Sequence, residues 1–346
     1  MDNKYELLPI SQSQADEVVQ LANKVFGIGA SMLISKKDMW GYYATDGEHI
    51  VGGVLLEKAS EKEGFLSWIF VDSSARGHRL ASRLIQSGFD ALNKEGLTKQ
   101  FALVRDDNTA SWNMFLKAGY KILPVHKSLF GYSVKGLFKR FSYSMPTGYS
   151  IWVKDDAQNN KPTYPNYPII RVLLGSILIG ATLALYGVRS IEFLIVALIT
   201  VIGITLLRLI VAFPIARLYG PVRFMPSRGG FILSFFIALI FSAWWPTFGF
   251  FVPKEDNWNS HDFKKNEGYQ ALATWLLLNA TFIFASFAFP DIFTSGLNFV
   301  LMLVIIYQMI PIFPFDNFDG AKVLRWNKLA YVIGVIITML TIILLL

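Results

Sequence analysis

Hydrophobic and polar residues are distributed differently in the two halves of the chain. Up to about Asp156 charged residues recur every few positions, whereas the sequence from Tyr167 to Leu346 is mostly Leu, Ile, Val, Phe and Ala. The first pattern is typical of a water-soluble fold and the second of helices that span a membrane. The sequence therefore predicts three parts: a soluble domain at 1–155, a linker at 156–167 and a membrane domain at 168–346.

In the first half, segments with strand periodicity and segments with helix periodicity follow one another. We expect strands at 4–10, 41–44, 49–58, 64–71, 100–105 and 148–154, and helices at 14–26, 79–94 and 109–117. Asn108 is a suitable cap for the last helix. A turn containing Arg76 and Gly77 lies directly before the second helix, where unpaired backbone N–H groups favour an anion. This order predicts an α+β domain with a mixed central sheet and flanking helices.

In the second half, six apolar segments are each long enough to cross a bilayer. They lie at 169–188, 191–213, 230–252, 269–289, 297–315 and 329–346. The sequence thus predicts an all-α, multi-pass integral membrane domain of about six transmembrane segments. The chain opens without a basic stretch leading into an apolar run, so we expect no secretory signal and a cytosolic N-terminal domain.

The charge distribution supports this topology with one exception. The loop with Arg217, Arg223 and Arg228 is predicted to be cytosolic, as the positive-inside rule prefers. With six crossings the loop that contains Lys322 and Arg325 faces outward, against the same rule. That conflict predicts either a re-entrant segment or a partly buried loop in this region.

Composition excludes several kinds of site. The chain has no cysteine, so it forms neither disulfides nor thiolate metal sites, and its four histidines all lie outside the apolar segments. The net charge of +7 is small for 346 residues, and the basic clusters flank apolar segments. We therefore expect membrane lipids as partners and no nucleic acid.

Two motifs in the first half occur at a characteristic separation. "RGHRLA" (Arg76–Ala81) comes after a predicted strand, and "RDDNTASWNMFLKAGYK" (105–121) covers the third helix and the residues on either side of it. Together they resemble the GNAT acetyltransferase superfamily over about 1–127. The resemblance implies acetyl-CoA as co-substrate, with its pyrophosphate bound at the first motif. The residues that it implies for cofactor binding are Val71, Arg76, Gly77, His78, Arg79, Leu80, Ala81 and Asn108.

Two departures from the GNAT pattern concern the chemistry. Arg79 replaces the usual first glycine of the pyrophosphate loop, where its side chain either crowds the phosphates or binds them as a cation. Phe115 replaces a tyrosine that often acts as general acid, and phenylalanine cannot donate a proton. Glu57 and Asp72 are the candidate bases, because both lie near the strands that border the family's cleft. The alternative is that they are surface carboxylates on an inert scaffold.

The segment "VHKSLFGYSVKGLFKRFSYSM" (125–145) has aromatic residues at helical spacing with basic residues between them. One interpretation is a helix that lies at the membrane interface, with aromatics in the acyl region and lysines toward anionic head groups. The other is an insertion before the last strand of the sheet, packed on its own domain. The two interpretations are compatible.

Two stretches of the second half resemble the site-2 protease family of intramembrane zinc proteases. These are "AFPIARLYG" (212–220) and "IPIFPFDNFDGAKVLRWN" (310–327). In that family an HExxH helix and an Asp-Gly turn supply the metal ligands. The resemblance puts Asp319, or alternatively Asp316, at the aspartate position. Where the family has its first histidine, its glutamate and its second histidine, this chain has Arg208, Leu209 and Ala212.

Because no membrane segment contains a histidine, no change of register restores a zinc site, and we expect neither zinc nor zinc-dependent proteolysis. A charge inside a membrane segment usually faces protein or water. Arg208 is therefore predicted to form a salt bridge with Asp316 or Asp319 in place of the metal. The alternative is that Arg208 extends to the head-group level.

Two functions are consistent with the sequence. One is a membrane-anchored N-acetyltransferase that uses acetyl-CoA on an unidentified amine, with the proteolytically inactive membrane domain as an anchor or as the recognition element for a transmembrane substrate. The other is a non-catalytic scaffold or accessory subunit that binds a transmembrane protein partner.

Overall fold

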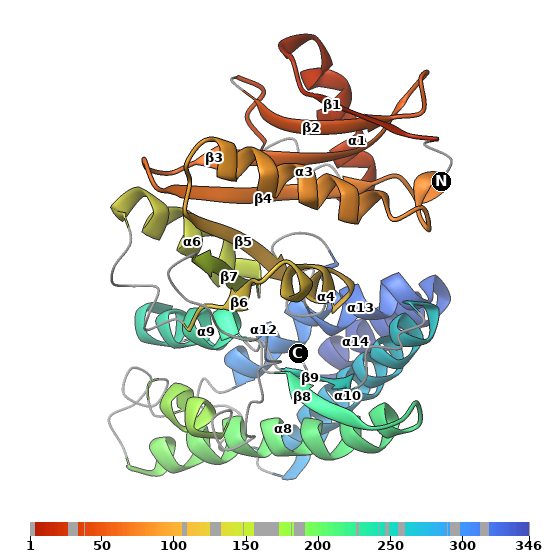
Figure 1. Cartoon of the computed structure of the whole chain (residues 1–346). Coiled ribbons are helices and arrows are strands. Elements are labelled where there is room, and N and C mark those ends of the chain that lie inside the picture. The colour runs from red at the N-terminus through yellow and green to blue at the C-terminus, as the bar shows by residue number, and fades with distance from the viewer. Residues whose placement is uncertain are drawn as a thin grey trace. The chain divides into compact units, whose positions relative to one another are not determined.

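The structure is a computed structural model, and Figure 1 shows its strands and helices. It describes residues 4–26, 34–37, 39–105, 109–124, 133–147, 149–155, 173–180, 182, 191–225, 228–241, 243–245, 249–254, 260–288, 290, 298–311 and 318–345. The chain forms two compact units. The first contains Met1–Val104, Ser111–Tyr143 and Ser150–Thr163, and the second contains Arg105–Ala110, Ser144–Tyr149 and Tyr164–Leu346.

The first unit is built on a mixed sheet. Within the described residues the sheet has seven strands, in the order β1-β2-β3-β4-β5-β7-β6. β1 to β4 form an antiparallel meander, and β5 then pairs with β4 in parallel. The strands are β1 (Glu6–Pro9), β2 (Trp40–Thr45), β3 (Ile50–Lys58), β4 (Glu63–Val71), β5 (Lys99–Arg105), β6 (Lys121–Ile122) and β7 (Tyr149–Asp155). The prediction of a mixed central sheet with flanking helices is confirmed, although the two-residue β6 was not expected.

Helices α1 (Ala15–Phe26) and α3 (Leu80–Lys94) cover opposite faces of this sheet. Val18, Val19 and Ala22 of α1 pack in one core cluster with Leu55 of β3 and Phe70 of β4. Residues next to Leu55 along β3 point to the other face, where Val54 and Leu56 approach Gly88 of α3. The sheet is therefore the middle layer of three, which is the layer arrangement expected when helices alternate with strands.

Helix α6 (Val134–Thr147) corresponds to the basic segment before the last strand. Lys139 forms a salt bridge with Glu57 of β3, and the guanidinium of Arg140 lies 4.9 Å from the ring centre of Phe101. Arg140 is fully buried and 3.9 Å from the carboxylate of Glu63. Two of the basic side chains expected at lipid head groups therefore contact the sheet instead, as the interpretation of an insertion packed on its own domain predicts.

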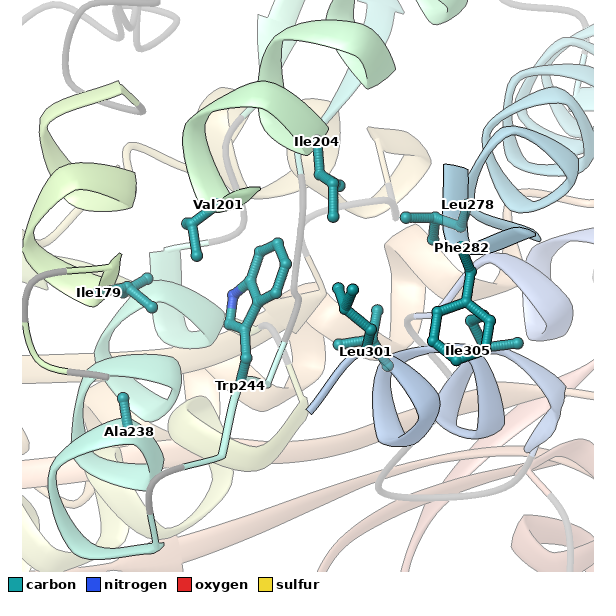
Figure 2. Packing of buried hydrophobic residues seen from close by; sticks show 10 residues of the cluster. Ile179, Val201, Ile204, Ala238, Trp244, Leu278, Phe282, Leu301 and Ile305 are labelled. Carbon is teal, nitrogen blue, oxygen red and sulfur yellow. The ribbon is translucent and has the colours of Figure 1, made fainter. Parts of the chain in front are cut away.

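In its described residues the second unit is helical apart from one hairpin. Its helices are α8 (Ile191–Arg217), α9 (Arg228–Phe241), α10 (Ser260–Ala288), α12 (Asn298–Met309), α13 (Asp319–Trp326) and α14 (Lys328–Leu345), and residues 173–180 are helical too. The hairpin pairs β8 (Val222–Met225) with β9 (Phe250–Pro253). In Figure 2 the indole of Trp244 lies among Ile179, Val201 and Leu301, within a core cluster that draws on several helices.

Among the residues that the structure describes, two helices of this unit are long and apolar enough to cross a membrane. They cover Leu194–Arg217 and Asp262–Ala288, and α14 is a shorter apolar helix. The prediction that 230–252 forms a single membrane span is wrong. Helix α9 ends at Phe241 and the chain forms strand β9 from Phe250. The prediction of about six spans thus stays a prediction.

A polar stripe along α10 joins three other elements of the helical unit. The amide of Asn266 donates to the carbonyl of Ala216 at the end of α8 (3.0 Å). Gln270 pairs with both backbone groups of Phe251 in β9, at 3.0 and 3.1 Å. One turn further, Thr274 donates to the carboxylate of Asp319 (3.1 Å). These side chains recur every fourth residue, so one face of α10 satisfies polar groups that lipid would leave unpaired.

Gly320, at the first turn of α13, allows a close approach to α12. A Cβ added at Gly320 would lie 1.9 Å from the carbonyl oxygen of Gln308, a backbone atom that cannot move aside independently. Gly203 in α8 is a helical glycine with no neighbour within 4 Å of an added Cβ.

We expect Gly320→Ala to destabilise the helical unit severely, because the clash forces α12 and α13 apart. Gly203→Ala should be neutral or raise stability by up to about 1 kcal/mol, since alanine favours a helix. The measurement is thermal unfolding of the detergent-solubilised chain. Equal melting temperatures for the two variants would contradict the packing of α13 on α12.

Candidate functional site

Strands β4 and β5 pair over only part of their length. The described pairs join Glu63–Leu66 of β4 to Lys99–Ala102 of β5, and beyond them the described residues of the two strands form no further pairs. The divergence begins at Ser67, where the register of β4 against β3 shifts by one residue. A bulge of this kind ends strand pairing and is frequent next to active sites. The edge of β4 from Ser67 to Val71 is thus open to an extended ligand on the β5 side.

The hydroxyl of Ser67 was not identified from the sequence. Its oxygen is buried, and it has no hydrogen-bond partner among the described residues. Buried hydroxyls normally have such a partner, so an orphan at the point where two strands diverge indicates a position for a ligand group. A lone serine in a strand gives no sequence signal that could have revealed it.

The loop after β4 leads into the N-terminus of α3. Gly77 adopts a φ of +87°, which side chains disfavour and which glycine adopts freely. The side chains of Arg76, His78 and Arg79 are exposed around it. The backbone N–H groups of Leu80, Ala81 and Ser82, at the start of α3, donate to no acceptor within the described part of the chain. Free N–H groups, a helix dipole and nearby cations together suit a phosphate group.

Arg79 has an unusual backbone conformation. It is the only non-glycine residue with positive φ among those that the structure describes, at φ +55° and ψ +19°. It stands directly before α3 and provides no side-chain cap. The left-handed conformation costs a non-glycine residue about 1–2 kcal/mol. Because its side chain is exposed, Arg79 can reach a bound anion without filling the space in front of the helix.

Asp72, one of the two candidate bases, is engaged by four donors, of which the hydroxyl of Ser73 is the most distant, at 3.5 Å from Oδ1. Its Oδ1 accepts hydrogen bonds from the backbone N–H and the hydroxyl of Ser74, at 2.9 and 2.8 Å. Its Oδ2 lies 2.6 Å from the ammonium of Lys24. Lys24 first, and then Ser74, hold the pKa of Asp72 well below its usual range. A carboxylate with so low a proton affinity is a poor general base, so we expect a structural role for Asp72.

Glu57, the other candidate base, lies at the end of β3 and forms the salt bridge with Lys139 described above. Glu57 remains about 37% exposed at its side chain, whereas burial lowers the pKa of Lys139. Glu57 can therefore be reached from solvent, and its partner holds it in one place. Of the two candidates it is the one that can still exchange a proton with an external group. Asn108, the remaining candidate, lies outside the described residues.

The helical unit contains a second cluster of residues that the sequence singled out. The guanidinium of Arg208 contacts the carboxylate of Asp319 through two nitrogens, at 2.6 and 2.9 Å. Both residues are buried, and the backbone N–H of Asp319 donates to the side chain of Gln308 (3.1 Å). The Arg208–Asp319 pair expected from the sequence is therefore present, and the alternative in which Arg208 extends to the head groups is wrong. Asp316 lies outside the described residues.

The positions that the sequence resemblance aligned with protease active-site residues also line one cavity. Its empty volume is about 460 Å³, part of it open to solvent, and its lining includes Arg208, Leu209, Ala212, Asp319, Glu267 and Lys322. Glu267, which the sequence reasoning missed, lies 3.9 Å from Lys322 and 3.8 Å from Arg325. Lys322 is buried, as one of the two explanations of the topology conflict requires. Among the described residues no group of three or more His, Cys, Asp or Glu could hold a metal ion.

The sequence of the first unit matches a known family. Residues 20–120 match the model of the Acetyltransferase (GNAT) family. This range contains β2 to β5, the bulge in β4, the loop at 72–79 and α3. Residues 20–120 form a GNAT domain. No curated protein matches the chain.

Solved structures are similar to this chain at low identity. An IAA acetyltransferase from Bacillus cereus is 14% identical, with 35% of this chain and 79% of that chain covered and a TM-score of 0.31. Rv2747 from Mycobacterium tuberculosis, solved in complex with CoA, is 15% identical, with coverages of 43% and 98% and a TM-score of 0.33. The ribosomal-protein-S18-alanine N-acetyltransferase from Escherichia coli is 12% identical, with coverages of 46% and 99% and a TM-score of 0.34.

Within the GNAT domain, the residue at the usual tyrosine position belongs to the core. Phe115 in α4 (Thr109–Lys117) is buried, with its ring 5.2 Å from that of Tyr120 and 6.1 Å from that of Phe89. The hydroxyl of Tyr120 is also buried and donates to Gln100 at 2.9 Å. Neither residue is placed to act on a substrate, so proton transfer in this domain requires another group.

Arg79→Gly should raise the free energy of unfolding by about 1 kcal/mol, because glycine carries no penalty in the left-handed conformation. Arg76→Gly is the matched control. Arg76 is an exposed arginine of the same loop in ordinary extended backbone, φ −72° and ψ +158°, so glycine there should lower stability slightly. Urea unfolding of both variants tests this. A variant Arg79→Gly no more stable than Arg76→Gly would contradict the strain at Arg79.

Arg208→Leu should destabilise the helical unit by about 3–5 kcal/mol, because it leaves the carboxylate of Asp319 buried without its charge partner. The double variant Arg208→Leu/Asp319→Leu should lose less than the sum of the two single variants. Arg217→Leu, at the exposed end of the same helix, is the control. Thermal unfolding in detergent measures all four, and an Arg208→Leu variant as stable as Arg217→Leu would rule out a structural salt bridge.

Proposed function

We propose that the chain is a membrane-anchored N-acetyltransferase that transfers an acetyl group from acetyl-CoA to an amine. The observation that carries the proposal is the combination, in one GNAT domain, of an open β4 edge and, at the adjacent start of α3, backbone N–H groups that have no acceptor among the described residues. An extended pantetheine arm can pair with the free backbone groups of Ser67–Val71. The pyrophosphate then reaches the N-terminus of α3 at Leu80 and Ala81, beside Gly77 and Arg79.

The transfer needs three things from the protein. The neutral amine of the acceptor attacks the carbonyl carbon of the thioester, the C–S bond breaks, and the thiolate of CoA leaves. Backbone N–H groups on the open edge of β4 polarise the carbonyl oxygen as negative charge develops on it. Glu57 receives the proton that the amine loses, directly or through water, and Lys139 holds Glu57 in position. In this proposal Asp72 orders the loop and takes no part in proton transfer.

The helical unit supports the membrane part of the proposal through its exposed apolar faces. Ile195, Ile199 and Ile210 of α8 are 50%, 65% and 66% exposed. Only 28% of the apolar stretch of this helix is buried within the protein. A core helix of a soluble protein would bury most of these side chains. Helix α14 exposes a similar face at Ile336, Leu340 and Ile343. Lipid is the solvent that suits such surfaces. The N-terminal domain is accordingly proposed to be cytosolic.

A second candidate function is a non-catalytic scaffold. It is favoured by the salt bridges of both candidate bases, since Asp72 is paired with Lys24 and Glu57 with Lys139. In this case the GNAT domain is a docking module, and the helical unit, with a degenerate site-2-protease-like cavity, recognises a transmembrane partner. The two functions differ in whether the full chain binds CoA and turns over acetyl-CoA.

We expect the purified full chain in detergent to bind CoA in a calorimetric titration, and Gly77→Val to weaken this binding at least about tenfold. Valine strains the positive φ of Gly77 and displaces the loop. The control is Gly47→Val, which places the same strain on a hairpin turn, at φ +103° with open space around it. If the wild-type chain has no measurable affinity for CoA, the enzyme proposal fails and the scaffold remains.

For turnover, Glu57→Gln should lower the release of CoA from acetyl-CoA by about 100-fold in the presence of accepted amines, because it removes the base. The dissociation constant for CoA should stay the same, since Glu57 lies away from the loop. Asp72→Asn should instead change CoA affinity. A Glu57→Gln variant with full turnover would exclude Glu57 as the base.

A further inference from the structure

The start of the proposed anion-binding loop, residues 72–79, is fixed by contacts from β3, from the loop itself and from α1. Asp72 follows β4 directly, and its backbone N–H donates to the carbonyl of Val51 in β3 (2.8 Å). Its side chain caps the short 3₁₀ helix Ser73–Ala75 through Ser74. The ammonium of Lys24, on α1, lies 2.6 Å from Oδ2 of Asp72. Helix α1 is thus joined by a charged contact to the first residue of the loop.

Burial of this ion pair is strongly asymmetric. The side chain of Asp72 is 8% exposed and that of Lys24 is 69% exposed. Lys24 therefore extends over the surface and places only its ammonium against a nearly buried carboxylate. A buried carboxylate must be compensated, whereas a surface lysine can be replaced at little cost to packing. The low pKa of Asp72 agrees with a permanently ionised group.

The far end of the loop is fixed as well. Arg83, in the first turn of α3, donates to the carbonyl of Tyr5 (3.0 Å), and the rings of His78 and Tyr5 meet edge to face at 5.6 Å. Between these two anchors the residues Arg76–Arg79 are exposed, with one residue in the left-handed conformation beside the positive φ of Gly77. A loop held at both ends presents its N–H groups without paying an ordering cost when a ligand binds.

We propose that Lys24 and Asp72 are positioning residues for CoA: the pair holds the loop in the geometry that binds the pyrophosphate and couples that geometry to α1. This inference rests on the proposed function, because it concerns the same cofactor site. Neither residue needs to touch CoA. Asp72 acts through Ser74 and the backbone of the loop, and Lys24 acts through Asp72.

The test is a calorimetric titration of CoA into the full chain in detergent. Lys24→Met should raise the dissociation constant about fivefold, the upper range for a pair with one exposed partner. Lys24→Arg keeps the charge and should remain within about twofold of the wild type. The matched control is Lys36→Met, which removes another lysine paired with an α1 carboxylate, Asp16 at 2.5 Å, with both partners exposed. That control should bind CoA as the wild type does.

Two further measurements separate positioning from general destabilisation and from direct contact. In the CoA-free protein, amide hydrogen exchange at 74–79 should be faster in Lys24→Met, while the melting temperature stays that of Lys36→Met. Asp72→Asn should weaken CoA binding at least as much as Lys24→Met does. The double variant should bind CoA as tightly as the single variant with the lower affinity. If Lys24 bound the phosphates itself, Asp72→Asn would release it and leave CoA affinity unchanged or higher.

Each outcome decides between the two proposals. A wild-type chain that does not bind CoA overturns the proposed function, whatever the variants do. A wild-type chain that binds CoA, with Lys24→Met indistinguishable from Lys36→Met, overturns the positioning role and leaves the cofactor site intact.

Discussion

The partial pairing of β4 with β5 is the constraint on which the proposed cofactor site depends. Strands that are paired along their whole length offer no backbone groups to a ligand, whereas β4 is released at Ser67 by a one-residue bulge. The other features of the proposed site follow in the chain after the residue at which β4 separates from β5. The open edge leads to Val71, Asp72 caps the next turn, and the loop delivers the chain to the N-terminus of α3. Function here follows from backbone groups that are left available, and side chains mainly fix where those groups lie.

The helical unit depends on a different kind of contact, namely buried charge and amide pairs. Arg208 and Asp319 join α8 to α13, and the stripe formed by Asn266, Gln270 and Thr274 joins α10 to its neighbours. Such pairs give little net stability in water, but in an apolar surrounding they specify which elements meet, because every mismatched arrangement leaves a polar group unsatisfied. The exposed apolar faces of α8 and α14 are therefore not needed to determine which elements of the unit meet. This division suits a unit that is proposed to lie in lipid.

Much of the first unit was predictable from sequence, because its strands and helices have distinct periodicities and are separated by turns. The loop at 72–79 was predictable for the same reason, from Gly77 and the helix after it. The bulge at Ser67, the bond from Lys24 to Asp72 and the packing of α6 were not, since they depend on residues far apart in sequence. In the second half, continuous apolar sequence conceals its breaks. Pro246 and Gly249 are turn-forming residues within 230–252, but the apolar residues around them favoured a single span, whereas α9 ends at Phe241 and strand β9 begins at Phe250. The Arg208–Asp319 pair was accessible because two charges in apolar segments require partners.

The most direct test is an experimental structure of the full chain with CoA bound. We expect the pyrophosphate within hydrogen-bond distance of the N–H groups of Leu80 and Ala81, and the pantetheine arm along the edge of β4 from Ser67 to Val71. The salt bridge between Lys24 and Asp72 should be present in the bound state. A structure in which CoA lies elsewhere, or in which the loop must unfold from α3 to admit it, would show that the open edge of β4 and the start of α3 are not the cofactor site.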